Sequence, residues 1–275
     1  MKPMHVSLLQ AVVLLVTAPA WAQQAPESAM PAIRVEGLSD PDDQSYRAMV
    51  RGMDAFEKYR ALAPAAQLRY RLYPRLPGVQ AGGTRVRIEG DSASIDVPLG
   101  PDLSFTLPRD ARAWDERARV TTNRTSRSFA WAPDVRTPGV PANARRLGDL
   151  RLECEIDRAA TLMAGFKPPA YHVIDALVDV CTTYPGAWLY YGERPVFNVT
   201  LVHGQRRESL FAMSLYGNML LKPFQLFYDF YPLLIDRTYT LKISDTSWPD
   251  DTLVELEYMD DAKDAVAATG PAVAR

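Results

Sequence analysis

Three short segments of alternating apolar and polar residues follow one another between residues 84 and 110. Alternation with a period of two is typical of half-buried β-strands, because successive side chains point to opposite faces of a sheet. Gly90 with Asp91, and Gly100 with Pro101, lie between the segments and favour turns. The alternating apolar positions are Val86, Ile88, Ile95, Val97, Leu99, Leu103, Phe105 and Leu107. The pattern predicts an antiparallel meander of three strands.

A different spacing begins after Asp43, where apolar residues recur every three or four positions. This spacing places them on one face of a helix, opposite a charged face. Asp42 or Asp43 can cap the start, and Pro64 ends the pattern. Gly52 is unfavourable inside a helix by about 1 kcal/mol. The apolar face consists of Tyr46, Met49, Met53, Phe56, Tyr59 and Leu62. We expect an amphipathic helix packed on a β core.

Further alternating segments predict strands in both halves of the chain. In the segment 147–156 the apolar positions include Cys154, which therefore points toward its apolar neighbours. Residues 123–126 predict a hairpin turn between two of the strands, and residues 158–166 predict a short helix. Residues 173–181 fit either a strand or a helix. The predicted strands are 68–73, 119–122, 128–131, 147–156, 196–202, 209–216, 239–243 and 253–258.

Many short strands separated by turns, without a regular βαβ rhythm, indicate sandwich architecture. The sequence predicts a mainly β protein with two antiparallel β-sandwich-like domains packed together and one N-terminal amphipathic helix. The predicted organisation is a signal peptide at 1–22, a flexible leader at 23–43, a helix plus β-sandwich domain at 44–166, a second β-rich domain at 170–260 and a disordered tail at 261–275.

The first 22 residues have the pattern of a secretory signal peptide. Lys2 is positive, residues 6–16 are an apolar run, and Ala20 and Ala22 form a small-x-small cleavage site. The run is short for a membrane span, and no other run predicts a transmembrane segment. We expect a periplasmic or secreted protein.

Charge gives no indication of a nucleic-acid partner. The chain has 31 Lys and Arg against 33 Asp and Glu, a net charge of −2. Removal of the signal peptide takes away Lys2 and no acid, so 30 − 33 leaves −3. A protein that binds nucleic acid through its phosphates usually carries a basic excess.

The chain has two cysteines, Cys154 and Cys181. Export would place them in an oxidising compartment, where a disulfide between them is expected; two buried free thiols are the alternative. A metal site is not predicted, because the mature chain adds only His172 and His203 and no CxxC or HxxxH spacing.

Residues 68–156 resemble secreted transthyretin-like or carboxypeptidase-regulatory-type β-sandwich modules. The resemblance rests on a strand, a loop, the segment Ile95 to Leu99 (IDVPL) and then Ser104 to Pro108 (SFTLP). It covers about a third of the chain. Such modules are usually accessory or binding domains, so the resemblance implies no catalytic residue.

The sequence contains none of the common catalytic motifs, such as a nucleophile elbow, a zincin helix or a phosphate-binding loop. His172 and His203 are the histidines available to a Ser-His-Asp site, and each is more typical of a surface or packing position. A pair of carboxylates for glycoside hydrolysis stays an open alternative, since acidic residues are plentiful but no pair stands out. We predict no catalytic residue and no cofactor.

Aromatic residues are dense in the second half of the chain. Such residues stack on sugar rings or fill protein interfaces when exposed, and they fill the space between sheets when buried. We predict a non-enzymatic protein with a binding or envelope-assembly role and an envelope protein or polysaccharide as partner. The alternative is an extracytoplasmic carbohydrate-active hydrolase using unassigned Asp or Glu residues. The candidate binding residues are Trp188, Tyr190, Tyr191, Tyr228 and Tyr231.

Overall fold

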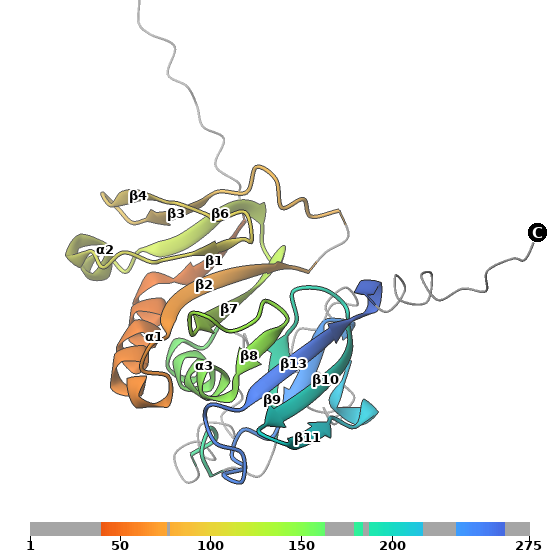
Figure 1. Ribbon diagram of the computed structural model, residues 1–275. Helices are drawn as coiled ribbons and strands as arrows, with labels where there is room; N and C mark the ends of the chain where they lie inside the picture. The colour runs from red at the N-terminus through yellow and green to blue at the C-terminus, as the bar shows by residue number, and fades with distance from the viewer. Residues whose placement is uncertain (1–39, 76–77, 163–178, 184–186, 217–234, 262–275) are drawn as a thin grey trace, which may run out of the picture. The chain divides into compact units, whose positions relative to one another are not determined.

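The computed structural model describes residues 40–75, 78–162, 179–183, 187–216 and 235–261 (Figure 1). These residues form a mainly β structure with several antiparallel sheets. Two large hydrophobic cores lie within it, one in each half of the described chain. Tyr228 and Tyr231 lie outside the described residues.

The first half of the described chain forms two antiparallel sheets, with strand orders β1-β6-β3-β4 and β5-β2-β7. Apolar side chains from both sheets enter the first core. The first sheet consists of β1 (Pro41–Ser45), β6 (Arg119–Thr125), β3 (Val86–Glu89) and β4 (Ser94–Val97). The second consists of β5 (Ser104–Phe105), β2 (Gln67–Pro74) and β7 (Phe129–Arg136). Strand β1 begins inside the leader predicted for residues 23–43.

The predicted meander at residues 84–110 is wrong in its third strand. Strands β3 and β4 pair as expected, but β5 pairs with β2 in the other sheet. The hairpin predicted around residues 123–126 is also wrong, because β6 and β7 belong to different sheets. The Phe129 backbone, at the start of β7, donates a hydrogen bond to the Asp42 carboxylate of β1 at 2.6 Å. Alternation predicts which face of a strand is buried, but it does not predict the neighbouring strand.

Helix α1 (Tyr46–Lys58) lies where the spacing of apolar residues predicts a helix, and it is followed by the short 3-10 helix η1 (Arg60–Leu62). Its cap is Ser45, whose hydroxyl accepts a hydrogen bond from the Ala48 backbone at 3.4 Å. Its apolar face packs into the first core. The short helix α2 (Ala111–Asp115) is capped in the same way by Asp110.

Gly52 lies where α1 packs against its neighbours. A Cβ atom at this position would lie 2.8 Å from the hydroxyl oxygen of Tyr70 and 3.0 Å from the Cβ of Ala160. The Tyr70 side chain is 1% exposed, and its hydroxyl donates to the Met49 backbone oxygen at 2.6 Å. The close approach of helix α3 (Leu147–Ala160) therefore explains a glycine that the helical pattern disfavours.

The segment predicted as a strand at residues 147–156 is instead helix α3 (Leu147–Ala160). Leu152, Ile156 and Ala160 recur every four residues and enter the first core. Leu147, Leu150 and Cys154 recur at three and four and enter the second core. Because both faces of the helix are buried, the two apolar faces overlap along the sequence and imitate the alternation of a strand.

The second half of the described chain forms a four-stranded antiparallel sheet of order β11-β10-β13-β8 and a two-stranded pair of β9 and β12. Together with α3 they enclose the second core, and Figure 1 shows α3 beside β7 and β8. The bounds are β8 (Ala144–Arg146), β9 (Trp188–Tyr191), β10 (Val196–His203), β11 (Arg206–Ser209), β12 (Thr238–Leu241) and β13 (Leu253–Tyr258).

The strand predicted at residues 209–216 is misplaced. Strand β11 ends at Ser209, and the short 3-10 helix η2 (Ala212–Ser214) follows. Gly204, at φ +57°, allows a tight turn, so that His203 at the end of β10 pairs directly with Arg206 at the start of β11. All four residues of β11 are exposed. Neither face of this strand is buried, so its sequence has no alternation of apolar and polar residues.

Within the described residues, no helix combines the length and the apolar character needed to cross a membrane.

We predict that Gly52→Ala destabilises the protein by about 1–3 kcal/mol through overpacking against the buried Tyr70 hydroxyl. This outweighs the gain of about 1 kcal/mol in helix propensity. Urea unfolding at pH 7 measures the difference. Gly82→Ala is the matched control, because no atom lies within 4 Å of its added Cβ and its φ is not positive. Equal stability of the two variants would contradict the packing role of Gly52.

Candidate functional site

Charged side chains gather on one face of the β2–β7 pair. Alternation along β2 sends Tyr70 and Leu72 into the first core and Arg69 and Arg71 to the opposite face. The antiparallel register places Arg69 across from Asp134 and Gln67 across from Arg136. This local pairing builds a cluster of opposite charges from two neighbouring strands.

Arg71 is the centre of the cluster. Its side chain is 9% exposed, and its guanidinium contacts three carboxylates. One terminal nitrogen lies 2.8 Å from Asp102 and 3.1 Å from Asp134, and the other lies 2.8 Å from Glu193. Arg136 adds contacts of 2.7 Å to Asp134 and 2.9 Å to Glu193. Glu193 follows β9, so the cluster joins the two halves of the described chain.

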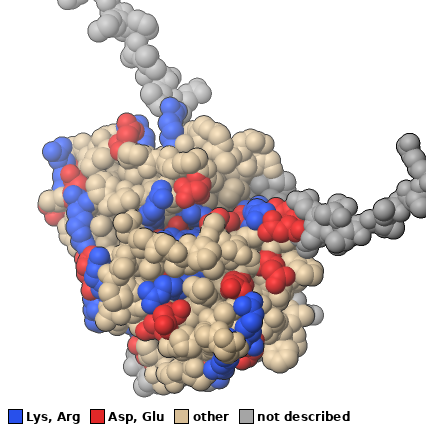
Figure 2. Space-filling model, in the orientation of Figure 1, with Lys and Arg blue, Asp and Glu red and all other residues tan. Residues whose placement is uncertain are grey.

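These charges line an open hollow of about 350 Å³, which we call the charged hollow. Three arginines and three acidic residues contribute to it, so its formal charge sums to zero. Figure 2 shows basic and acidic side chains interspersed over the face in view. The lining residues are Gln67, Arg69, Arg71, Asp102, Asp134, Arg136, Pro138, Ala142 and Glu193.

Two of the lining carboxyls are held in their ionised form. Burial acts to raise the pKa of Asp134, but the nearby guanidinium groups, led by that of Arg136, outweigh it and hold this pKa below its usual range. Burial also acts to raise the pKa of Asp102, while hydrogen bonds from Ser104 and the charge of Arg71 lower it overall. Neither residue is suited to donate a proton at neutral pH.

A second ion pair is buried inside the protein and contacts β7. Arg145 of β8 and Glu153 of α3 are hydrogen-bonded to each other and are each 5% exposed. Glu153 also accepts from the Val135 backbone at 2.7 Å, and Arg145 donates to the Val135 oxygen at 2.9 Å. Burial raises the pKa of Glu153 above its usual range, although Arg145 opposes the shift. The pair anchors α3 to β7.

Three of the aromatic residues predicted as a binding site are among the described residues, and they lie elsewhere. Tyr190 is 2% exposed, packs on Tyr239 at 5.7 Å between ring centroids and donates to the Leu150 oxygen at 2.8 Å. Tyr191 is 8% exposed and packs on Tyr73 at 5.2 Å. Trp188 is half-buried against the second core. The two tyrosine rings therefore occupy the interior, and none of the three residues lines the charged hollow.

Sequence reasoning did not single out the residues of the charged hollow. The available sign was the pair of arginines, Arg69 and Arg71, alternating with apolar residues in the middle of a strand. Asp134 and Arg136 repeat that alternation just beyond the strand predicted at residues 128–131. The register between β2 and β7 brings these four residues together, and Glu193 joins them from a distant part of the chain.

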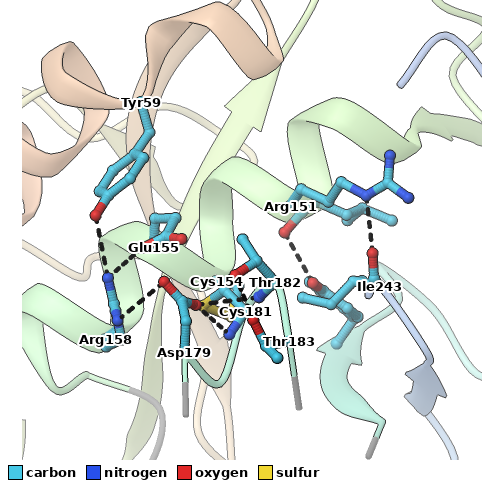
Figure 3. Close-up of a disulfide and its surroundings, with 12 residues drawn as sticks. Tyr59, Arg151, Cys154, Glu155, Arg158, Asp179, Cys181, Thr182, Thr183 and Ile243 are labelled. Atoms are coloured by element: carbon cyan, nitrogen blue, oxygen red, sulfur yellow. Dashed lines mark hydrogen bonds and ion pairs between the residues drawn. A yellow bond between two sulfur atoms is a disulfide. The ribbon is translucent and has the colours of Figure 1, made fainter. Parts of the chain in front are cut away.

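The predicted disulfide between Cys154 and Cys181 is confirmed, with a Cα–Cα distance of 5.8 Å. Figure 3 shows it on α3, beside an ion cluster centred on Arg158. Arg158 lies 2.7 Å from Glu155 and 3.5 Å from Asp179, and Asp179 accepts from the Cys181 backbone at 2.9 Å. Glu155, Asp179 and Cys181 are close enough to share a cation. However, the sulfur of Cys181 is bonded and the carboxylates face an arginine, so this group is poorly suited to a metal.

No protein-family model, no curated protein and no solved structure matches this chain. The resemblance of residues 68–156 to transthyretin-like modules stays a prediction, and its last expected strand is part of helix α3.

We predict that reduction of the disulfide lowers the free energy of unfolding by about 3–4 kcal/mol, because the unfolded chain regains the entropy of a closed loop. The sequence separation across the bridge is 27 residues. Urea unfolding with and without reductant measures the loss. A Cys154→Ala and Cys181→Ala double variant serves as control and should show no response to reductant. An unchanged wild-type midpoint in reductant would contradict the stabilising role.

We predict that Asp134→Asn destabilises the protein at pH 7 by about 1–3 kcal/mol, since Arg71 and Arg136 each lose one carboxylate partner and keep another. The folded pKa of Asp134 lies below the unfolded value. Stability from its ionisation is therefore complete above the unfolded pKa and is lost as pH falls through the folded pKa. The difference from wild type should shrink in acid.

Urea unfolding of both proteins from pH 7 down to about pH 3 measures this change, and other titrating groups cancel in the difference. Asp96→Asn is the control, because Asp96 has an 85% exposed side chain in its pair with Arg87 and should cost under about 1 kcal/mol. A pH-independent effect of Asp134→Asn would show that ionisation of this residue does not stabilise the fold.

Proposed function

We propose that this protein is an exported, non-enzymatic binding protein whose ligand occupies the charged hollow. The observation that carries the proposal is the state of its carboxyls. Asp102 and Asp134 are paired with arginines and have lowered pKa values, so they accept hydrogen bonds and do not donate protons. Fixed, ionised and mutually paired groups recognise a ligand without reacting with it.

The charge of the hollow favours a ligand that is neutral and polar or that carries both signs of charge. Its guanidinium groups donate hydrogen bonds and its carboxylates accept them, and neither sign is in excess. A sugar, a peptide or the exposed part of an envelope protein has this chemistry. The proposed partner is therefore an envelope polysaccharide or protein, and nucleic acid is not proposed.

The proposed location is the periplasm or the exterior of the cell, with residues 1–22 acting as a signal peptide. The disulfide supports an oxidising compartment. We also propose that the two hydrophobic cores correspond to two packed β domains, which share α3.

A carbohydrate-active hydrolase is supported less well. A retaining or inverting glycosidase needs one carboxyl with a raised pKa facing another across its substrate. Burial raises the pKa of Asp42, Glu153 and Glu155, but none of these residues lines the charged hollow. Each is instead hydrogen-bonded within the fold.

Thermal unfolding in the presence of oligosaccharides of N-acetylglucosamine, maltose oligomers and dipeptides tests the proposal. We expect at least one of these classes to raise the Tm of the wild type and to lose this effect in Glu193→Gln. Glu193 is chosen because its side chain is 42% exposed at the rim and contacts both Arg71 and Arg136. Glu255→Gln, which alters an exposed pair with Arg207, is the matched control and should keep the shift.

Release of reducing sugar is measured in the same samples. Hydrolysis that disappears in Glu193→Gln would overturn the proposal in favour of the hydrolase. A wild-type Tm that no member of the panel changes would contradict ligand binding at the charged hollow.

A further inference from the structure

A second hollow, of about 380 Å³, lies along the edge of β2, and we call it the edge hollow. It shares Gln67 and Arg69 with the charged hollow, so the two adjoin at these residues. The residues lining the edge hollow are Gln67, Leu68, Arg69, Pro98, Phe105 and Thr106.

Strand β2 has an unfilled edge at this place. On one side it pairs with β7 over its whole length, from Gln67 to Pro74. On the other side β5 is only two residues long, and its last residue, Phe105, lies opposite Tyr70. Among the described residues, β2 therefore has no strand partner on this side from Gln67 to Arg69.

The ladder defines which backbone groups point into the edge hollow. In an antiparallel pair, alternate residues direct their N–H and C=O groups to the same neighbour. The N–H of Leu72 donates to the Leu103 oxygen at 3.0 Å on the β5 side. Counting back in steps of two, Tyr70 and Leu68 point to this side as well. Leu68 thus presents a backbone donor and acceptor to the hollow.

From this geometry we propose that the ligand is an extended peptide segment that adds to β2 at Leu68, in line with β5. The inference rests on the proposed binding function and specifies its ligand. An added strand makes backbone hydrogen bonds to the edge, and its side chains alternate between the two faces of the sheet. Every second side chain would then point toward the face of Arg69, where the charged hollow begins.

In this arrangement the edge hollow binds the peptide backbone and the charged hollow binds its side chains. The backbone N–H and C=O of Leu68, in the edge hollow, hold the peptide backbone independently of its sequence. The exposed parts of Arg69 and Glu193, with side-chain exposures of 41% and 42%, select charged side chains of either sign. An oligosaccharide has no row of N–H and C=O groups for Leu68 and is the competing occupant.

Selection from a phage-displayed library of random heptapeptides on the full chain, followed by fluorescence anisotropy with the synthetic peptides selected, tests the inference. We expect binding to fall about tenfold or more in Leu68→Pro, which removes the N–H that faces the hollow. Leu68→Ala keeps that N–H and removes only side-chain contacts, so it should lose much less affinity than Leu68→Pro. An equal loss in the two variants would contradict the role of the backbone N–H.

A scan of N-methylated peptides on the wild-type protein gives a second measurement that does not depend on the folding of Leu68→Pro. We expect methylation at the position paired with Leu68 to weaken binding about tenfold, and methylation of the next residue to have little effect. The inference would be overturned if no peptide is selected, or if neither Leu68→Pro nor N-methylation changes the affinity. The Tm shift that depends on Glu193 would still stand in that case, so the proposed function is tested separately.

Discussion

Helix α3 is the constraint on which the rest of the described structure depends. One face of it enters the first core through Leu152 and Ile156, and the other enters the second core through Leu150 and Cys154. A helix buried on both faces admits little change of position, because interiors are packed to crystal-like density. Strands β7 and β8, and the helix α1 at its glycine, are held relative to this one element.

Burying ionised groups between two cores is costly, and well-packed apolar residues often provide more stability. The cluster around Arg71 and the pair of Arg145 with Glu153 are therefore poor candidates for the main source of stability. These contacts instead connect the two halves of the described chain. Glu193 of the second half lies within 2.9 Å of both Arg71 and Arg136 of the first half. Ionic contacts of this kind favour one relative position of the strands over close alternatives.

Local pattern predicted strands such as β3 and β13, and the helix α1, because each has one more deeply buried face and a clear period. It failed for residues 147–156 because α3 has two buried faces, and for β5 because its two residues carry no information about their partner. The charged hollow was missed for a related reason. Arg71, Asp134 and Glu193 are far apart in sequence and are ordinary charged residues individually. Strand pairing brings Arg71 and Asp134 together, and the packing of the second half adds Glu193.

Contacts between the two halves, from Glu193 to Arg71 and Arg136, also line the charged hollow, which links the proposed binding to packing. A ligand that contacts Glu193 and Arg136 contacts both halves at once, so its binding free energy adds to the interactions that hold them in position. Conversely, the paired charges keep these side chains in place before a ligand arrives, which lowers the entropic cost of binding. The sequence retains costly buried charges at a position where they also organise an accessible surface, and this double use favours the binding site proposed at the charged hollow.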